Sequence, residues 1–251
     1  MPNKVNSTPG EVETVQPKQG TWRTYDVTDG LPGGIRCMFQ DHQGYLWLGT
    51  TAGLCRYDGV EFLTYTVADG LAANIVTAIC EDREGRLWFG TEGGGVSCFD
   101  GARFITYTVE DGLLDNRVNG LLQDREGGFW FAQFWSGLMR FDTETVMCLT
   151  DHPVSQILIQ DSQGCLWFGD ENDLFCLFEG QARRQPFARP IYGLLEDSRG
   201  YFWVATEGDG LYRYDSAEAV WPPLPPQLWG VGALWARGGG ERFAISRRRR
   251  V

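Results

Sequence analysis

The chain has 251 residues, is 43% hydrophobic and carries a formal net charge of −11 at pH 7. An acidic surface repels phosphate backbones, so this charge excludes a nucleic-acid-binding function. No run of about 18 apolar residues occurs, which excludes a membrane-spanning helix within this sequence. Residues 1–20 are polar and lack the apolar stretch of a signal peptide, so we expect a flexible N-terminal lead-in.

After this lead-in, one short phrase recurs along the chain. The phrase is D-x-x-G-x-[LF]-W, and its copies lie at residues 41–47, 82–88, 124–130, 161–167 and 197–203. Successive aspartates are 41, 42, 37 and 36 residues apart, a period typical of propeller blades. A weaker copy, VGALWARGGGERFAI, has Phe243 in place of the tryptophan. The repeat therefore predicts five complete units and a partial sixth.

Each unit contains four strand-like segments joined by tight turns. In the second unit these segments are residues 74–81, 86–91, 95–100 and 103–108. Four short antiparallel strands form one blade, and one blade alone cannot bury both of its apolar faces. Blades must therefore stack around a common axis. The predicted fold class is all-β: a β-propeller of four-stranded antiparallel blades, with five complete repeats plus a partial sixth.

The repeat also sets the predicted boundaries. The propeller is expected over residues 21–246, between the lead-in at 1–20 and a basic tail at 247–251 that contains Arg247–Arg250. Its repeats are expected at about residues 21–60, 61–102, 103–145, 146–181, 182–218 and, in part, 219–246. The segment WRTY at residues 22–25 is a candidate outer strand that closes the last blade. A five- or six-bladed ring and a part of a larger ring both agree with these units.

The repeated tryptophan occupies the same strand position in every unit. A buried aromatic ring removes about 150–250 Å² from water, which makes this position a strong packing site. We expect structural wedges between neighbouring blades at Trp47, Trp88, Trp130, Trp167 and Trp203. The aspartate that opens the phrase is expected to accept backbone N–H groups within its own turn, and the glycine to supply a positive φ.

The seven cysteines are odd in number and contain no C-x-x-C pair. They are Cys37, Cys55, Cys80, Cys98, Cys148, Cys165 and Cys176. Because most of them lie in apolar segments, we interpret them as small core residues in a reduced compartment rather than as a disulfide framework.

The first complete unit resembles the two-component regulator propeller repeat. Here it reads DHQGYLWLGTTAGLCRYDGVEFLTYTVADGLAANIV over residues 41–76, and the resemblance is close through 22–142 and looser over 143–218. The resemblance implies a sensor-type β-propeller of hybrid histidine kinases, a class that is usually extracytoplasmic. The sequence departs from that picture because it contains no kinase or receiver region, and neither His42 nor His152 lies in a phospho-acceptor helix pattern.

Candidate binding residues lie in loops on one face of the predicted propeller. The loops that lead into the inner strands repeat Asp-Gly-Leu, as at residues 29–31, and turn formation with capping by Asp and Asn explains them. The turns between the second and third strands vary from unit to unit, and variation on a fixed frame favours binding. The candidates are Glu92, Phe134, Trp135, Asp170, Glu171, Asp173, Glu207 and Asp209. Trp135 lies outside the wedge position, so packing alone does not require it.

Recognisable catalytic and metal motifs are absent from the sequence. No G-x-S-x-G, H-E-x-x-H or phosphate loop occurs, and the D-R-E-G turn is a poor calcium cage because an arginine stands beside its carboxylate. We therefore predict no metal, no cofactor and no catalytic residue. The alternative is a propeller enzyme, a lyase or a glycan-active protein, that uses acidic residues such as Glu92 and Glu207 at the channel mouth.

The predicted function is a non-catalytic sensor module of a signal-transduction system, either as it stands or as part of a larger two-component sensor. Its partner is expected to be an unidentified small molecule, glycan or protein at the loop face. The location stays open. Two features favour the cytoplasm: the absence of a signal peptide and the presence of free cysteines. If the chain is part of a sensor of this family, it would instead be periplasmic.

Overall fold

The repeat units fold into five antiparallel sheets in the computed structural model. The structure describes residues 22–133, 136–141, 145–148, 158–169, 173–178, 181–186, 191–206, 210–215 and 246–249. Helices in this part of the chain are limited to short 3-10 turns, and none of them has the length and apolar character needed to cross a bilayer.

Each sheet is one blade, and the blades follow the order of the chain. Blade 1 contains β1 (Ile35–Gln40), β2 (Leu46–Thr50), β3 (Leu54–Tyr57) and β4 (Phe62–Tyr65). Blade 2 contains β5 (Val76–Glu81), β6 (Leu87–Thr91), β7 (Val96–Phe99) and β8 (Phe104–Tyr107). Blade 3 contains β9 (Val118–Gln123), β10 (Phe129–Gln133), β11 (Gly137–Phe141) and β12 (Thr145–Cys148). Blade 4 contains β13 (Leu158–Gln160), β14 (Leu166–Gly169), β15 (Asp173–Phe178) and β16 (Gln181–Pro186). Blade 5 contains β17 (Ile191–Glu196), β18 (Tyr201–Thr206) and β19 (Gly210–Asp215).

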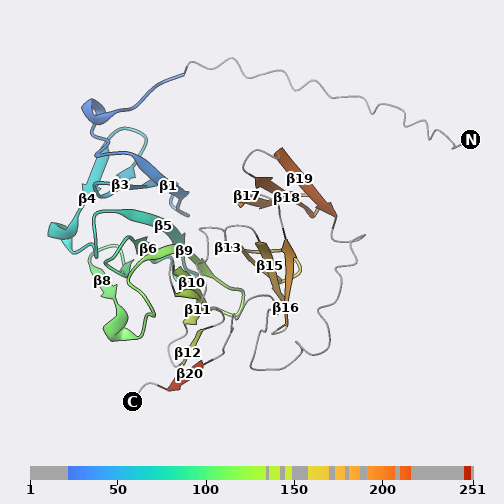
Figure 1. The fold of residues 1–251 in the computed structure, drawn as a ribbon. Coiled ribbons are helices and arrows are strands. Elements are labelled where there is room, and N and C mark those ends of the chain that lie inside the picture. Colours follow the sequence, from blue (N-terminus) through green and yellow to red (C-terminus); the bar gives the residue numbers. More distant parts are fainter. Residues whose placement is uncertain are drawn as a thin grey trace, which may run out of the picture.

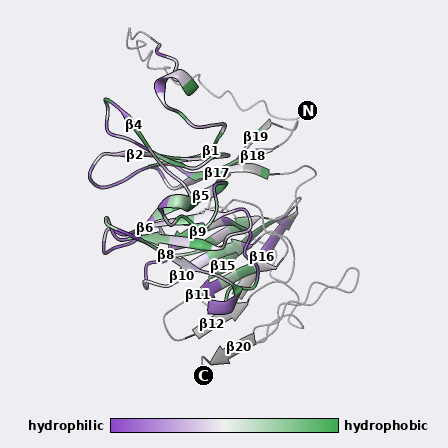
Figure 2. Ribbon diagram, turned by 90° about the vertical axis from the view of Figure 1, so that its left-hand side faces the viewer, coloured by the Kyte–Doolittle hydropathy of each residue, from purple (hydrophilic) through white to green (hydrophobic). Residues whose placement is uncertain are grey.

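The blades are arranged around a common axis, with β1, β5, β9, β13 and β17 nearest to it (Figure 1). Consecutive strands within each blade pair antiparallel, so the predicted propeller of mostly four-stranded blades is confirmed. Hydrophobic segments lie along the strands and hydrophilic segments at the turns on the rims (Figure 2). The core therefore sits between the stacked blades.

The predicted strands of the second unit agree with the observed ones to within one or two residues at each end. The segment predicted at 74–81 becomes β5, and the one predicted at 86–91 becomes β6. The predicted partial sixth repeat at 219–246 lies outside the described residues, except for Ser246.

Two predictions about the chain ends differ from the structure. Residues 22–26 form no strand, so the closing strand predicted at 22–25 is not formed. Instead, Tyr25 packs on blade 1, with its ring centroid 5.5 Å from that of Tyr57. At the other end, β20 (Ser246–Arg249) pairs with β12, so the basic tail predicted from residue 247 begins inside a strand. The outer edge of β12 has backbone groups that need partners, which is why a further strand can add there.

The loops into the inner strands of the first three blades each contain a 3-10 turn that the sequence analysis missed. These turns are η1 (Val27–Asp29), η2 (Val67–Asp69) and η3 (Val109–Asp111). Each has a capping box, in which the residue before the turn and the aspartate at its end satisfy each other's backbone N–H groups. In η2, for example, the backbone N–H of Thr66 donates to Asp69 Oδ2 at 2.8 Å. The following glycine closes the turn in the left-handed region, as Gly70 does at φ 102°.

The aspartate of the repeated phrase does more than shape its own turn. In blade 1, Asp41 Oδ1 accepts the backbone N–H groups of Gln43 and Tyr45 at 3.0 and 2.9 Å, as predicted. Its Oδ2 accepts a further bond from Trp47 Nε1 at 2.7 Å, which the sequence analysis missed. The same indole bond joins Asp82 to Trp88, Asp124 to Trp130, Asp161 to Trp167 and Asp197 to Trp203. Each turn is therefore fixed to the strand that follows it.

Each tryptophan from blade 1 to blade 4 packs against the next blade. Trp47 shares a buried cluster with Phe89 and Phe99 of blade 2, and Trp88 lies 4.2 Å from Phe129 of blade 3 between ring centroids. Trp130 and Trp167 make the corresponding clusters with blades 4 and 5. Trp203 is only half-buried.

A second link, which we name the clasp, joins the turns of neighbouring blades. The backbone N–H of the residue after the turn aspartate donates to the side chain of the residue before the turn aspartate in the next blade. The distances are 3.0 Å for His42 to Glu81, 2.9 Å for Arg83 to Gln123, 2.9 Å for Arg125 to Gln160 and 2.7 Å for Ser162 to Glu196. All successive pairs among the five blades therefore share one kind of joint.

We expect Gln160→Ala to lower the free energy of unfolding by about 1 kcal/mol, because one net hydrogen bond between blades 3 and 4 is lost. The Gln160 amide also donates to Gly164 O at 3.2 Å, so Gln160→Glu serves as the control. The Gln160→Glu variant keeps an oxygen acceptor for the clasp and should retain most of the wild-type free energy of unfolding. Urea denaturation of both variants measures the difference, and an equal loss in the two would contradict the assignment.

A pair of positions beside the aspartate and tryptophan changes from blade to blade. One residue directly follows the turn glycine. The other lies on the third strand of the blade, in register with the tryptophan on the second strand. The pairs are Tyr45/Arg56, Arg86/Cys98, Gly128/Arg140, Cys165/Cys176 and Tyr201/Arg213. In blades 1 and 5 the arginine stacks on the tyrosine, with 4.6 and 4.8 Å from the guanidinium to the ring centroid.

In blade 4 this pair is a disulfide, and the expectation that the cysteines are all reduced is wrong there. Cys165 and Cys176 lie 6.1 Å apart between Cα atoms, which suits a disulfide. Cys37, Cys55, Cys80 and Cys98 are free thiols. Burial raises the pKa of Cys80 to about 12 and that of Cys98 to about 11. These two thiols are therefore protonated and unreactive at neutral pH.

We expect Cys176→Ser to lower the free energy of unfolding by about 2–3 kcal/mol, because the disulfide restrains a short loop of the unfolded chain. Reductant should lower the melting temperature of the wild type and leave that of the variant unchanged. Thiol titration of the denatured, unreduced protein provides the control. A count of all seven cysteines as thiols would contradict the disulfide.

Candidate binding groove

Of the candidate residues that the sequence analysis named, only Glu92 and Asp173 lie within the described residues. Glu92 is exposed at the end of β6 and pairs with Arg36 of blade 1 at 3.3 Å. Asp173 is buried at the start of β15 and pairs with Arg184 at 2.5 Å. Phe134, Trp135, Asp170, Glu171, Glu207 and Asp209 lie outside the described residues. Both described carboxylates therefore already have an arginine partner.

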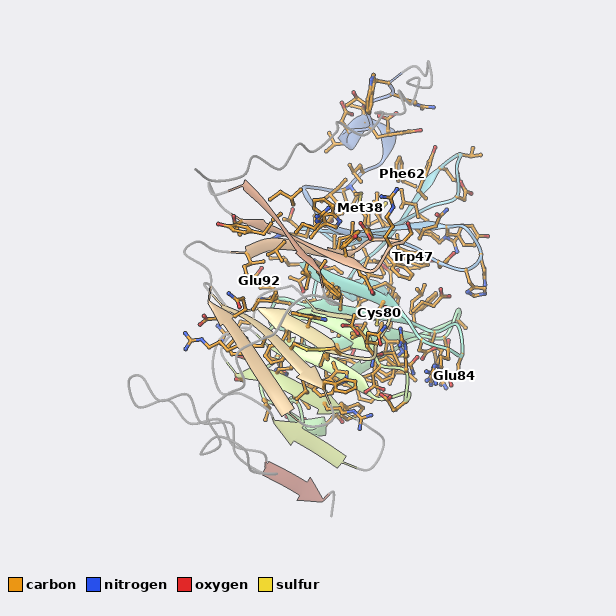
Figure 3. All side chains as sticks on the ribbon, turned by 90° about the vertical axis from the view of Figure 1, so that its right-hand side faces the viewer. Met38, Trp47, Phe62, Cys80, Glu84 and Glu92 are labelled. Carbon is orange, nitrogen blue, oxygen red and sulfur yellow. A yellow bond between two sulfur atoms is a disulfide. The ribbon has the colours of Figure 1, made fainter. Side chains whose placement is uncertain are left out.

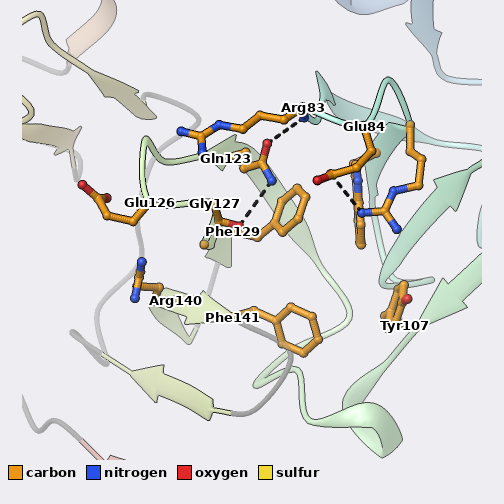
Figure 4. A pocket seen from close by; sticks show the side chains of 12 residues that line it. Arg83, Glu84, Tyr107, Gln123, Glu126, Gly127, Phe129, Arg140 and Phe141 are labelled. Atoms are coloured by element: carbon orange, nitrogen blue, oxygen red, sulfur yellow. Dashed lines mark hydrogen bonds and ion pairs between the residues drawn. The ribbon is translucent and has the colours of Figure 1, made fainter.

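The opposite face, which carries the D-x-x-G turns, has a groove between blades 2 and 3. Glu84 on this face and Glu92 on the loop face point to opposite sides of the molecule (Figure 3). The groove has a volume of about 720 Å³. Its walls are the turns of the two blades, with side chains from β8 and β11 (Figure 4). The lining residues that bear charge are Arg83, Glu84, Arg86, Glu126 and Arg140.

Small residues stand at the variable pair of the two blades that border this groove. In blade 2 the residue opposite Trp88 is Cys98, whereas blades 1, 3 and 5 have an arginine there. In blade 3 the residue after the turn glycine is Gly128, and a Cβ at this position would lie 2.6 Å from Arg140 Nη2. Gly128 therefore leaves the space that the Arg140 guanidinium occupies.

Arginines from different positions of the repeat bind the turn aspartates on both sides of the groove. In blade 2, Arg86 Nε donates to Asp82 Oδ2 at 2.7 Å. In blade 3, Arg140 on β11 makes the corresponding bond to Asp124 Oδ2 at 2.9 Å. Burial alone would raise the pKa of Asp124, but hydrogen bonds from Arg140, Trp130 and the Gly128 N–H outweigh it and lower this pKa. Asp124 is therefore held in its charged form.

Aromatic rings form the deep wall of the groove. Trp88 and Phe129 meet across the blade interface, and Tyr107 lies 5.9 Å from Phe141 between ring centroids. Trp88, Phe129 and Phe141 are buried, whereas Tyr107 is half-buried. The groove thus combines a charged rim with an apolar floor, an arrangement common to small-molecule sites.

The sequence analysis missed this groove because it assigned the D-x-x-G turns to the scaffold. The available signals were Gly128, where other units have a larger residue, and Cys98, where three units have arginine. Within the described residues, no three His, Cys, Asp or Glu side chains are grouped so as to hold a metal ion.

The sequence matches a family model described as two component regulator propeller over residues 29–52, 70–93, 112–134 and 186–208. Each matched segment contains one copy of the repeated phrase, and the copy at 161–167 lies outside them. No curated protein matches the chain.

Solved structures with the same fold include extracellular domains of one and two component systems. The extracellular domain of BT4673 from B. thetaiotaomicron, described as a one component system, is 21% identical with a TM-score of 0.60, over 73% of this chain and 28% of that chain. The extracellular domain of BT3049 from the same organism, described as a hybrid two component system, is 18% identical with a TM-score of 0.56, over 78% and 36% of the respective chains. Virginiamycin B lyase from Staphylococcus aureus, an inactive variant with quinupristin, is 16% identical with a TM-score of 0.62, over 77% and 72%.

At these identities the structural likeness shows the fold alone, and the chain spans 28–36% of the two B. thetaiotaomicron domains. The family match is independent of that likeness, because it comes from the sequence. Its four segments carry the turn aspartates and tryptophans of blades 1, 2, 3 and 5. The chain therefore contains four copies of the two component regulator propeller repeat.

Proposed function

We propose that this chain is a non-catalytic recognition propeller of a signal-transduction system, and that it binds a small ligand. The groove between blades 2 and 3 carries the proposal, because its volume of about 720 Å³ and its mixed polar and aromatic lining suit a small molecule. The family match and the likeness to extracellular domains of one and two component systems support the signalling context. The disulfide in blade 4 supports an oxidising compartment.

The groove favours binding over catalysis. Arg86 and Arg140 are tied to the buried aspartates beneath them, which leaves those aspartates unsuited to accept a proton from a substrate. On the loop face, Glu92 and Asp173 are likewise paired with arginines. Trp135, which lies outside the described residues, stays a candidate for contact with a ligand or a partner.

Thermal-shift measurements against a panel of amino acids, peptides, sugars and nucleotides test the proposal. A ligand that binds only the folded state raises stability by about 2.7 kcal/mol at a concentration 100 times its Kd. The increase should disappear in Arg86→Ala, which removes one wall of the groove, and persist in Glu92→Ala on the opposite face. Turnover of a panel compound, or a ligand whose effect depends on Glu92 rather than Arg86, would contradict the proposal.

A further inference from the structure

We propose that the groove binds a zwitterion of amino-acid or dipeptide size, with Arg83 holding its carboxylate and Glu126 its ammonium group. This inference rests on the proposed function and names its ligand class. Some charged side chains in the groove form ion pairs within the protein, and the others are available to a ligand.

Most of the charged groups in the groove have partners. Arg86 pairs with Asp82 at 2.7 Å and with Glu84 at 3.3 Å. Arg140 pairs with Asp124 at 2.9 Å. Among the described residues, Arg83 makes no ion pair with a carboxylate, and Glu126 makes none with a basic side chain. Arg83 and Glu126 are therefore the basic and the acidic side chain of the groove that have no ion-pair partner among the described residues.

The Arg83 guanidinium is held in place without being neutralised. Its Nη2 donates to the backbone carbonyl of Arg125 and, at 3.4 Å, to that of Asp124. Its backbone N–H makes the clasp to Gln123 at 2.9 Å. A guanidinium has five N–H donors, so this arrangement leaves donors for a carboxylate, which arginine binds through paired hydrogen bonds.

Glu126 lies in the exposed turn of blade 3, and Arg83 and Glu126 are at the same end of the groove, with Glu84 at the other (Figure 4). A ligand with a single negative charge would meet Glu126, and one with a single positive charge would meet Arg83. Only a ligand with both charges satisfies both side chains. Its apolar part would face Tyr107 and the aromatic wall.

Isothermal titration calorimetry with glycyl-L-leucine tests the inference, with its N-acetyl and C-amide derivatives as charge-blocked probes. We expect the free dipeptide to bind and each blocked form to bind about tenfold more weakly or not at all. Equal binding of the three compounds would overturn the inference. So would an absence of dipeptide binding to a protein that another panel compound stabilises, and that result would leave the proposed function standing.

Two variants separate the roles of the charges. Arg83→Gln should weaken binding of the free dipeptide by about tenfold while having little effect on the C-amide form. Glu126→Gln should weaken binding of the free dipeptide similarly and leave the N-acetyl form unaffected. Unchanged binding in either variant would overturn the assignment of that residue.

Arg125→Gln is the matched control for Arg83→Gln. Arg125 makes the same kind of contacts one blade further on, with its backbone N–H 2.9 Å from Gln160 Oε1 and its Nη1 2.9 Å from Ser162 O, and it does not line the groove. Arg125→Gln should therefore match Arg83→Gln in melting temperature and keep wild-type binding. A loss of binding in both variants would show that Arg83 acts through blade packing, which contradicts the inference.

Discussion

Trp47→Ala is expected to lower the free energy of unfolding by about 3–5 kcal/mol, the range for truncating a large buried aromatic residue. Trp47 is 2% exposed and packs between blades 1 and 2 against Phe89 and Phe99. Its loss would leave a cavity at the blade interface and an unpaired acceptor on Asp41. Urea denaturation followed by tryptophan fluorescence or circular dichroism measures the change.

Two further variants serve as controls for this measurement. Trp22 is fully exposed, so Trp22→Ala should change the free energy of unfolding by no more than about 0.5 kcal/mol. Trp47→Phe keeps part of the packing and removes the indole bond to Asp41, so it should fall between the wild type and Trp47→Ala. If Trp47→Ala were as stable as Trp22→Ala, the interface between blades 1 and 2 would not depend on this ring.

Asp124→Ala is expected to cost about 3–5 kcal/mol, because it removes one partner of a buried ion pair. Asp124 is 4% exposed, and its carboxylate accepts bonds from Gly128, Trp130 and Arg140. Its removal leaves the Arg140 guanidinium without its counter-charge. Arg140→Ala in the same background should recover part of the loss, which a double-mutant cycle measures.

Asp58 offers a comparison for Asp124. It accepts two backbone N–H groups in the turn between β3 and β4, at 2.8 Å from Val60 and 2.9 Å from Glu61, but it lies at the surface. Asp58→Ala should therefore have a much smaller effect than Asp124→Ala. Equal effects would show that the turn bonds alone explain the role of the repeated aspartate.

The pH dependence of stability follows from the same carboxylate. The pKa of Asp124 in the folded protein is lowered, so its contribution is complete above the pKa of an unfolded aspartate, about 3.9, and is lost as pH falls through the folded value. Asp124→Asn should make the melting temperature less sensitive to acid below about pH 4. An unchanged acid sensitivity would contradict this account.

The sequence predicted the blade architecture well because the relevant signals are local. The Asp, Gly and Trp of each phrase define a turn and the strand after it, so β5 and β6 were located to within two residues. The capping boxes at Thr66 and Thr108 are also local signals; capping by the aspartates was expected there, whereas the threonine partners and the 3-10 turns were missed.

The groove and the clasps were missed for a different reason. Arg83 meets Gln123 only after blades 2 and 3 have stacked, since 40 residues separate them in the chain. The groove is lined by residues of two repeat units, such as Arg86 of blade 2 and Gly128 of blade 3, which come together only when the blades stack. Such features depend on how neighbouring blades are placed relative to each other. The sequence pattern within one repeat unit carries no information about that placement.

The clasp uses a backbone N–H as its donor, and this has a consequence for how the repeats can diverge. The donor residue is His42, Arg83, Arg125 or Ser162, while the acceptor is always Glu or Gln. Any residue except proline can supply that N–H, so substitutions at the donor position leave the joint between blades intact. At these positions the backbone N–H, and not the side chain, makes the hydrogen bond that joins the blades. The rim of the propeller can therefore acquire new side chains, and with them new binding specificities, without loss of this bond.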